Sequence, residues 1–233
     1  MIFVPRTFRM IRLGAVHMLL AAACCFTVFP FLWMAVSSLK TKAEVMAADA
    51  FLPSTPQYGN YLEIVFHSPI PRYLANSLLV AVSVAAIQVM CCSFFAYGVT
   101  FMRIRGRDML FRLVLFTYMV PTAVTYIPCY IILSRLGLLD SYQGLILSNG
   151  VSVLGIFLLR QAFEAVPMET MEAARMDGAG HFRILTGVVF PMTRPSFVTF
   201  ILLSFINTYN SYMWPSLITD TPELSLVSQG LRR

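Results

Sequence analysis

The chain is poor in charged residues: only 12% of its 233 residues are Asp, Glu, Lys or Arg, whereas 58% are hydrophobic. A soluble domain carries about 25% charged residues, so this shortage argues against water as the main solvent of the folded chain. Acidic residues are fewer than basic ones, and the net charge is +6. The basic residues lie between long uncharged runs and form no basic stripe, which favours a membrane protein over one that binds nucleic acid.

The residue types that commonly carry chemistry are sparse as well. The sequence lacks the phosphate-binding pattern Gly-x-x-x-x-Gly-Lys-Ser/Thr, paired carboxylates beside the apolar runs and any nucleophile motif. His17 and His67 are isolated. The five cysteines lie inside apolar runs without the spacing of a zinc site or a disulfide framework; they are Cys24, Cys25, Cys91, Cys92 and Cys129. We therefore expect no catalytic residue, no metal and no cofactor, and no ATP hydrolysis by this chain alone.

Five long stretches contain no charged residue at all. They have 27, 30, 22, 19 and 25 residues and occupy positions 13–39, 73–102, 113–134, 141–159 and 195–219. A helix needs about 17–25 residues to cross the hydrocarbon core, and these runs lack the alternation of barrel strands. The sequence therefore predicts an all-α integral membrane protein with five spanning helices. The first run is too long for the apolar part of a cleaved signal peptide, so we interpret it as a retained anchor.

The Lys and Arg residues between these runs are unevenly shared. With the N-terminus inside, the inside segments hold eleven of them, namely Arg6, Arg9, Arg12, Arg103, Arg105, Arg107, Arg112, Arg160, Arg175, Arg183 and Arg194. The outside connections hold four, namely Lys40, Lys42, Arg72 and Arg135. The positive-inside rule therefore predicts a cytoplasmic N-terminus, and an odd number of spans places Arg233 outside.

The segment after the first run differs from the rest of the chain. Residues 38–72 hold four prolines, Pro53, Pro56, Pro69 and Pro71. Proline at this density opposes a long helix, so we expect an irregular loop with one short helix near 58–66. The sequence thus divides into an N-terminal anchor span with an extracytoplasmic loop, residues 1–72, and a core, residues 73–233.

The connection between the fourth and fifth runs, residues 164–191, has the pattern of a short helix outside the membrane. Pro167 suits the first helical position, where its missing N–H is not needed. Glu169 and Glu172 fall in the early turns, where the helix dipole favours negative charge. Gly178 is a stop signal. The pattern predicts a helix of about ten residues, which is marginal in water without a surface to pack against.

This helix has one weakly apolar face, because Met168, Met171 and Ala174 recur at helical spacing. Two interpretations remain open. The face packs on the cytoplasmic ends of the chain's own membrane helices, or the helix enters a groove on a cytoplasmic partner. We interpret Arg175 and Asp177 as solvated charges.

The same connection resembles the EAA loop of ABC importer permeases. That pattern is Glu-Ala-Ala, three residues, Gly, nine residues, an aliphatic residue, any residue, an apolar residue and Pro. This sequence matches every spacing, with Glu172, Ala173, Ala174, Gly178, Val188, Phe190 and Pro191. Val188 stands where Ile is usual, and Phe190 where Leu is usual. Seven positions in a twenty-residue frame are far more specific than a lone short motif.

Five further segments are similar to the carbohydrate branch of that family. They are residues 37–41, 60–61, 76–77, 136–142 and 209–215. Each match is weak, but together they indicate the branch that imports oligosaccharides, polyols or glycerol phosphates.

The resemblance implies a type I ABC importer permease bundle in a bacterial or archaeal cell (inner) membrane. It implies a non-catalytic subunit that works with a dimer of ATP-binding subunits, a second and more usually distinct permease, an extracytoplasmic solute-binding protein and membrane lipid, and with no nucleic acid. Each ATPase would hold one EAA helix in a cleft. The ATPase-coupling residues would then be Glu172, Ala173, Ala174 and Gly178. The family's sixth span is expected to be absent from this chain.

Polar residues inside the spans are candidates for a translocation path, and we name Gln88, Thr117, Asn207 and Asn210. Hydrogen bonding between helices is the alternative role for each. Pro121 and Pro128 are predicted to kink or interrupt the third span. Two other functions stay open. A truncated, non-transporting membrane scaffold is one, and an ion-coupled secondary transporter is the other, disfavoured because the spans lack ionisable residues.

Overall fold

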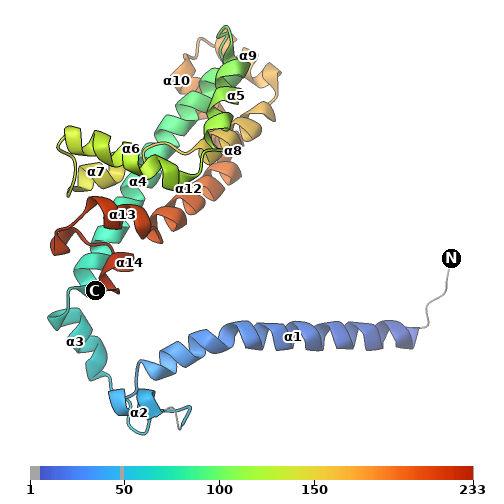
Figure 1. Ribbon diagram of the computed structural model, residues 1–233. Helices are drawn as coiled ribbons and strands as arrows, with labels where there is room; N and C mark the ends of the chain where they lie inside the picture. Colours follow the sequence, from blue (N-terminus) through green and yellow to red (C-terminus); the bar gives the residue numbers. More distant parts are fainter. Residues whose placement is uncertain (1–5, 48–49, 233) are drawn as a thin grey trace. The chain divides into compact units, whose positions relative to one another are not determined.

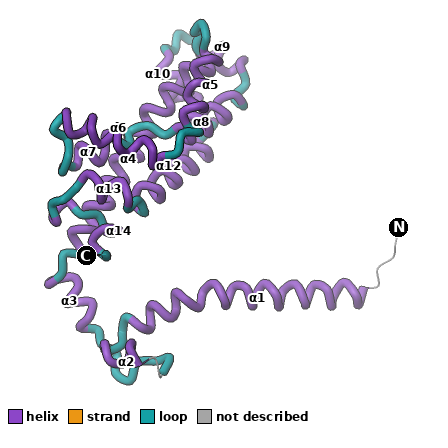
Figure 2. The backbone as a smooth tube through the Cα atoms, in the orientation of Figure 1, coloured by secondary structure: helices purple, strands orange, loops and turns teal. Residues whose placement is uncertain are grey.

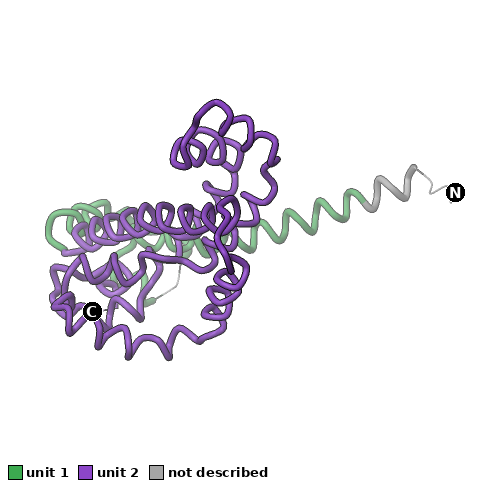
Figure 3. Tube along the Cα trace, turned by 90° about the horizontal axis from the view of Figure 1, so that it is seen from above, with its two compact units in different colours: residues 1–68 green, residues 69–233 purple. Residues whose placement is uncertain are grey.

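The computed structural model describes residues 6–47 and 50–232, with side chains from residue 13 onward. Every regular element in these residues is helical, and Figure 2 shows helices joined by loops, as the all-α prediction requires. Arg233, expected outside the membrane, lies beyond the described residues, as do the side chains of Arg6, Arg9 and Arg12. The chain forms two compact units, residues 1–68 and 69–233, coloured separately in Figure 3.

The first unit begins with α1 (Arg6–Ser37), and the part from Leu13 to Ser37 is long and apolar enough to cross a membrane. Pro30 lies inside this helix without ending it. The most apolar stretch of α1 buries none of its residues within the chain. A helix that is apolar and uncovered needs lipid or another subunit around it, so α1 agrees with the predicted anchor.

Short helices and polar contacts order the loop after α1. They are α2 (Lys42–Ala47) and α3 (Gly59–His67), and α3 confirms the short helix expected near 58–66. The Asn60 side-chain amide donates to the carbonyl oxygens of Ser38, at 2.9 Å, and Lys40, at 3.2 Å. Two of the segments that resemble the carbohydrate branch therefore contact each other in this loop.

A carboxylate fixes the turn that precedes α2. Glu44 accepts hydrogen bonds from the backbone N–H groups of Thr41 and Ser54, each at 2.9 Å. These bonds favour the charged form and lower the pKa of Glu44 to about 2. The turn is therefore held by the same contacts throughout the physiological pH range.

The second unit is built along α4 (Ile70–Phe101), which coincides with the second predicted span. Helices α8 (Val153–Glu164) and α12 (Arg194–Tyr209) pack along it, as Figure 1 shows. Their contacts bury one apolar cluster that contains Phe163, Phe197 and Phe200. A second cluster, without residues of α8 or α12, joins Val80 of α4 to Leu145, Trp214 and Leu226. Buried aromatic rings account for much of the apolar area in the first cluster.

The two ends of α4 carry different sets of short helices (Figure 1). Near its C-terminal end lie α5 (Arg107–Thr117), α9 (Met168–Met176) and α10 (His181–Ile184). Near its N-terminal end lie α13 (Met213–Ile218), the 3₁₀ turn Pro222–Leu224 and α14 (Val227–Gly230). The α4 axis thus separates the loops predicted inside from those predicted outside.

The remaining predicted spans are broken. Positions 113–134 form α5 and α6 (Thr122–Arg135), which meet at 99°. The break falls at Pro121, which precedes α6, whereas Pro128 stays inside α6. Positions 141–159 form α7 (Tyr142–Leu147) and α8, separated by residues 148–152.

The fifth predicted span is also interrupted. Positions 195–219 form α12 and α13, and the stretch His181–Met192, which includes a π-helical turn (Leu185–Val189) and α11 (Phe190–Met192), meets α12 at 88°. Pro191 and Pro195 flank that bend and remove two backbone donors from it. In the described residues, two helices are long and apolar enough to span a membrane, or up to four if each bent pair is one span. The count of five is therefore not confirmed.

Asp140 joins the α6–α7 loop to the segment after α13. Its own N–H donates to the Ile218 carbonyl at 2.8 Å, and its carboxylate accepts the N–H groups of Asp220 and Thr221, each at 3.0 Å. The Thr221 hydroxyl also donates to the carboxylate. These bonds, led by that of the Thr221 hydroxyl, hold the pKa of Asp140 below its ordinary value. Asp140 also has a positive φ of 51°.

Replacing Asp140 by alanine is expected to loosen residues 219–226. The variant loses three acceptor contacts and places a non-polar residue at a positive φ, which Asp and Asn tolerate best. Amide-exchange protection of this segment should fall about two- to tenfold per lost bond. Because the folded pKa is lowered, the carboxylate's contribution is complete above the ordinary carboxyl pKa and disappears as pH falls through the lowered value.

The matched control is Asp140→Asn, which suits the same φ and keeps one side-chain oxygen. We expect the Asn variant to retain part of the amide-exchange protection of residues 219–226. This protection should no longer fall at acidic pH, because the amide does not titrate. Equal protection in wild type, Asn and Ala variants would contradict the role of this carboxylate.

Candidate functional site

The segment that resembles the EAA loop contains a helix close to the predicted one. Helix α9 has nine residues and follows Pro167 directly. Its end is closed by two bonds, from the Gly178 N–H to the Arg175 carbonyl and from the Ala179 N–H to the Ala174 carbonyl, each at 3.0 Å. Gly178 has φ +77°, the left-handed conformation that this type of helix ending requires.

The two faces of α9 have different environments. Met171 is fully buried, and Ala174 packs against the same apolar cluster as Phe163. Glu172 and Ala173 are exposed. The predicted packing on the chain's own membrane helices is therefore confirmed for Met171 and Ala174.

Met168 does not join that buried face. Its side chain is 50% exposed, and Met176 is 88% exposed. An exposed face with two methionines and Glu172 stays available to a partner, so insertion of α9 into a partner's groove stays a prediction.

Arg175 is exposed, as the sequence predicts for a solvated charge, but it also makes a contact within the chain. Its guanidinium donates to the Phe101 carbonyl at the end of α4, at 3.3 Å. Nearby, the Tyr97 hydroxyl and His181 Nδ1 lie 3.1 Å apart. Both contacts tie the loop around α9 to the C-terminal end of α4. Asp177 is exposed and caps α9, which agrees with the predicted solvated charge.

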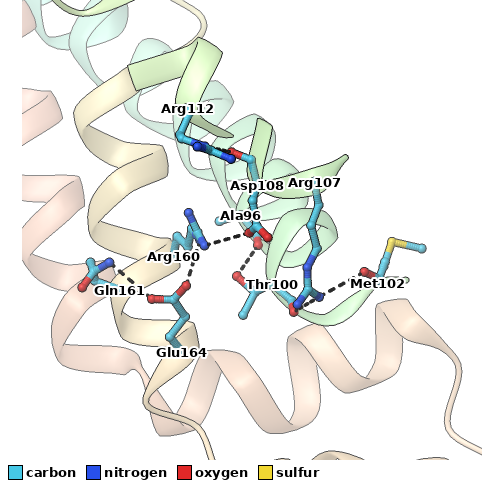
Figure 4. A network of polar contacts seen from close by, with 9 residues as sticks. All are labelled: Ala96, Thr100, Met102, Arg107, Asp108, Arg112, Arg160, Gln161 and Glu164. Carbon is cyan, nitrogen blue, oxygen red and sulfur yellow. Dashed lines mark hydrogen bonds and ion pairs between the residues drawn. The ribbon is translucent and has the colours of Figure 1, made fainter. Parts of the chain in front are cut away.

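A second polar network fixes α8 just before this loop, and Figure 4 shows it. The Arg160 guanidinium lies 2.9 Å from the Glu164 carboxylate and 3.4 Å from that of Asp108 on α5. It also lies 3.8 Å from the ring centre of Phe111. Charge pairs and a cation–π contact together link α5 to α8. In the sequence, Arg160 marks the end of the uncharged run 141–159, but no pattern there identifies these partners.

A polar pocket of about 190 Å³ lies between α4, the α7–α8 break and α12. It brings together two of the four predicted path residues, Gln88 and Asn207. The other two are not in its lining. Thr117 is exposed on α5, where its hydroxyl donates to the Val114 carbonyl at 2.6 Å, and Asn210 is an exposed residue that caps α12.

The break between α7 and α8 supplies polar groups that the sequence did not single out. Gln88 Nε2 donates to the Asn149 carbonyl at 2.7 Å, and Trp214 Nε1 donates to the Ser148 hydroxyl at 2.9 Å. Ser204 also lines the pocket and is only 5% exposed. Its hydroxyl has no hydrogen-bond partner within the described residues. In membrane proteins, irregular backbone is tolerated where it is buried in protein or lines a cavity.

Comparison with known proteins decides the family. Residues 88–231 match the family described as binding-protein-dependent transport system inner membrane component. The chain belongs to this family. It is therefore a membrane component of a transport system, and the resemblance to importer permeases is confirmed.

Individual relatives agree with this assignment. The chain is 30% identical to the sn-glycerol-3-phosphate transport system permease protein UgpE of Brucella abortus (strain 2308) over 225 residues, covering 93% of this chain and 80% of that protein. It is 29% identical to the protein of the same name in Yersinia pestis bv. Antiqua (strain Antiqua) over 223 residues, covering 93% and 79%. It also resembles a chain of a bacterial ABC transporter involved in the import of the acidic polysaccharide alginate. That match has a TM-score of 0.87 and 26% identity over 99% of this chain and 81% of the other.

Proposed function

We propose that this chain is the permease subunit of an ATP-driven importer for a sugar or a related compound, coupled to a cytoplasmic ATPase through α9. The observation that supports the coupling role is that one face of α9 is buried in the chain and another is exposed. Met171 anchors one face in the membrane-helix core, and the opposite face presents Glu172 and Ala173. Movement of α9 against a partner would reach α4 and α12 through the packed cluster around Phe197.

We assign the coupling role to Glu172, Ala173, Ala174 and Gly178. The small Ala173 side chain permits close approach of a partner, and Gly178 turns the chain back toward the membrane. Ala174, half-buried, would contribute from the inner side of the helix. The chain itself carries no ATPase motif, so the ATP-binding dimer is a separate partner.

The uneven distribution of Lys and Arg residues supports a cytoplasmic position for α9. The inside segments carry eleven Lys and Arg residues against four outside. Within the second unit, the helices that bear Arg107, Arg175 and Arg183 gather at the C-terminal end of α4 (Figure 1). We therefore place the N-terminus in the cytoplasm, and residues 1–72 as an anchor span and extracytoplasmic loop ahead of the core.

The relatives suggest the compound class and the partners. Their names refer to glycerol 3-phosphate and to an alginate importer, which agrees with the branch indicated by the sequence. A solute-binding protein and a second, distinct permease complete the proposed assembly. The uncovered α1 offers a surface for that permease or for lipid. Gln88 and Asn207 would line the path; Thr117 and Asn210, which are not among the residues that line the pocket, have the weaker support.

A mild-detergent pull-down of the tagged chain from its native membrane tests this function. We expect an ATPase, a second permease and a solute-binding protein to co-purify, and the complex to hydrolyse ATP. The chain purified alone should show no hydrolysis. Recovery of the chain without an ATPase from intact membranes, or hydrolysis by the chain alone, would contradict the proposal.

A further inference from the structure

The polar pocket beside α4 has a chemical character that the importer function alone does not specify. Its lining includes amide and hydroxyl side chains from three parts of the second unit. Its polar lining residues are Gln88, Asn149, Ser152, Ser204, Asn207, Thr208 and Ser211. Phe200 adds an aromatic ring to the same lining.

No charged residue is among the described residues that line this pocket. A phosphate or carboxylate that leaves water loses a large hydration energy, which a charged partner such as Arg or Lys compensates best. Amides and hydroxyls can both donate and accept hydrogen bonds, which suits the hydroxyl groups of a neutral polyol.

The Ser204 hydroxyl gives a second and independent indication of an occupant. It is 5% exposed, lines the pocket and has no partner within the described residues. Burying a hydroxyl without a partner is costly, so native structures rarely keep one without a reason. Asn207 and Thr208 follow Ser204 at helical spacing on α12, and Ser211, just beyond the end of this helix, reaches the same lining.

The size of the pocket limits what it can hold. Its volume of about 190 Å³ is many times the ~10–15 Å³ of such space that a cavity needs to hold one water molecule. One sugar ring or a short polyol suits this volume better than a chain of rings.

We propose that this pocket binds the uncharged, hydroxyl-rich part of the transported molecule, with Ser204 and Asn207 as direct contacts. The proposal rests on the importer function above and adds a requirement. Any phosphate or carboxylate of the substrate, such as those implied by the names of the relatives, is held outside this pocket.

The test uses the importer complex from the native membrane, reconstituted into proteoliposomes with its binding protein. The transported compound is first chosen as the one that most raises the melting temperature of that binding protein. The panel contains neutral hexoses, disaccharides and polyols, with glycerol 3-phosphate and galacturonate as hydroxylated anions, and amino acids as solutes that are not polyols. ATP-driven uptake of the chosen compound is then measured for wild type and variants.

We expect Ser204→Ala and Asn207→Leu each to raise the KM of uptake about two- to tenfold, the range of one lost hydrogen bond. The maximal rate and the ATP consumed per molecule should not change. Ser204→Ala removes a hydroxyl that has no partner in the described part of the chain, so the stability of the complex without substrate should not fall. Thr199→Val is the matched control, because Thr199 lies on the same helix but its hydroxyl is exposed and already donates to the Pro195 carbonyl at 3.0 Å.

Each outcome decides the question. Unchanged KM values in both pocket variants would overturn the pocket assignment while leaving the importer intact. A binding protein stabilised only by amino acids would contradict both the pocket assignment and the proposed compound class. Absence of ATP-driven uptake in the wild-type complex would instead count against the proposed function itself. A raised KM in the pocket variants but not in Thr199→Val supports the pocket.

Discussion

Replacing Gly178 by proline is expected to abolish ATP-driven uptake while leaving the protein in the membrane. Gly178 has φ +77°, whereas proline fixes φ near −65° and has no N–H to donate to the Arg175 carbonyl. The closing turn of α9 cannot form in this variant. Proline incompatibility costs about 3 kcal/mol, which corresponds to roughly a hundredfold loss of the competent conformation.

The milder variant Gly178→Ala separates conformation from contact. A Cβ at position 178 would meet nothing within 4 Å, so alanine adds strain without a clash. The left-handed conformation costs an alanine about 1–2 kcal/mol, which predicts a partial loss of uptake. Gly180→Ala is the matched control, because Gly180 has φ −73° and no neighbour within 4 Å of an added Cβ. Uptake in this control should equal that of wild type.

Glu172→Lys tests the exposed face of α9 without changing its fold. Glu172 is exposed, whereas its neighbour Met171 is fully buried, so the charge reversal leaves the buried contacts intact. We expect ATP hydrolysis by the complex to continue with much reduced uptake, which is uncoupling. The measurement is the ratio of ATP hydrolysed to substrate imported in proteoliposomes. Normal uptake in both Gly178→Pro and Glu172→Lys would remove the coupling assignment.

Local sequence patterns correctly predicted those parts of the structure that are determined by residues close together in the chain. The charge gap over 73–102 located α4 nearly to its ends. The Pro167 start and the Gly178 stop defined α9 because helix caps are local structures, and the positive φ of Gly178 is what such a stop requires. The EAA spacing identified the family for the same reason, since its residues form one continuous loop.

Features that depend on long-range packing escaped the sequence analysis. Nothing in the run 141–159 separates a continuous span from α7 and α8 with a break, because uncharged residues suit both. Arg175 looks solvated in sequence but meets the Phe101 carbonyl, 74 residues away along the chain. Ser204 looks like any small residue in a span, and only the packing of α12 on α4 reveals that its hydroxyl is buried at the pocket.

Gly155 lies where α8 packs most closely on α12. A Cβ added there would lie 2.1 Å from Cζ and 2.2 Å from Cε2 of Phe200, well inside any real contact distance. Phe200 is 2% exposed, so its ring has little room to move away. Overpacking of this kind typically costs about 1–3 kcal/mol and occasionally more.

Gly155→Ala is therefore expected to lower the melting temperature of the detergent-solubilised complex by several degrees, roughly 2–4 °C for each kcal/mol lost. Gly187→Ala is the matched control, because an added Cβ at Gly187 has no neighbour within 4 Å. Adding Phe200→Leu to Gly155→Ala should restore part of the loss, since the shorter side chain vacates the contested space. Because Phe200 also lines the polar pocket, the single variant should raise the KM of uptake as well. Equal melting temperatures for Gly155→Ala and Gly187→Ala would show that α8 and α12 are not packed this closely in the membrane.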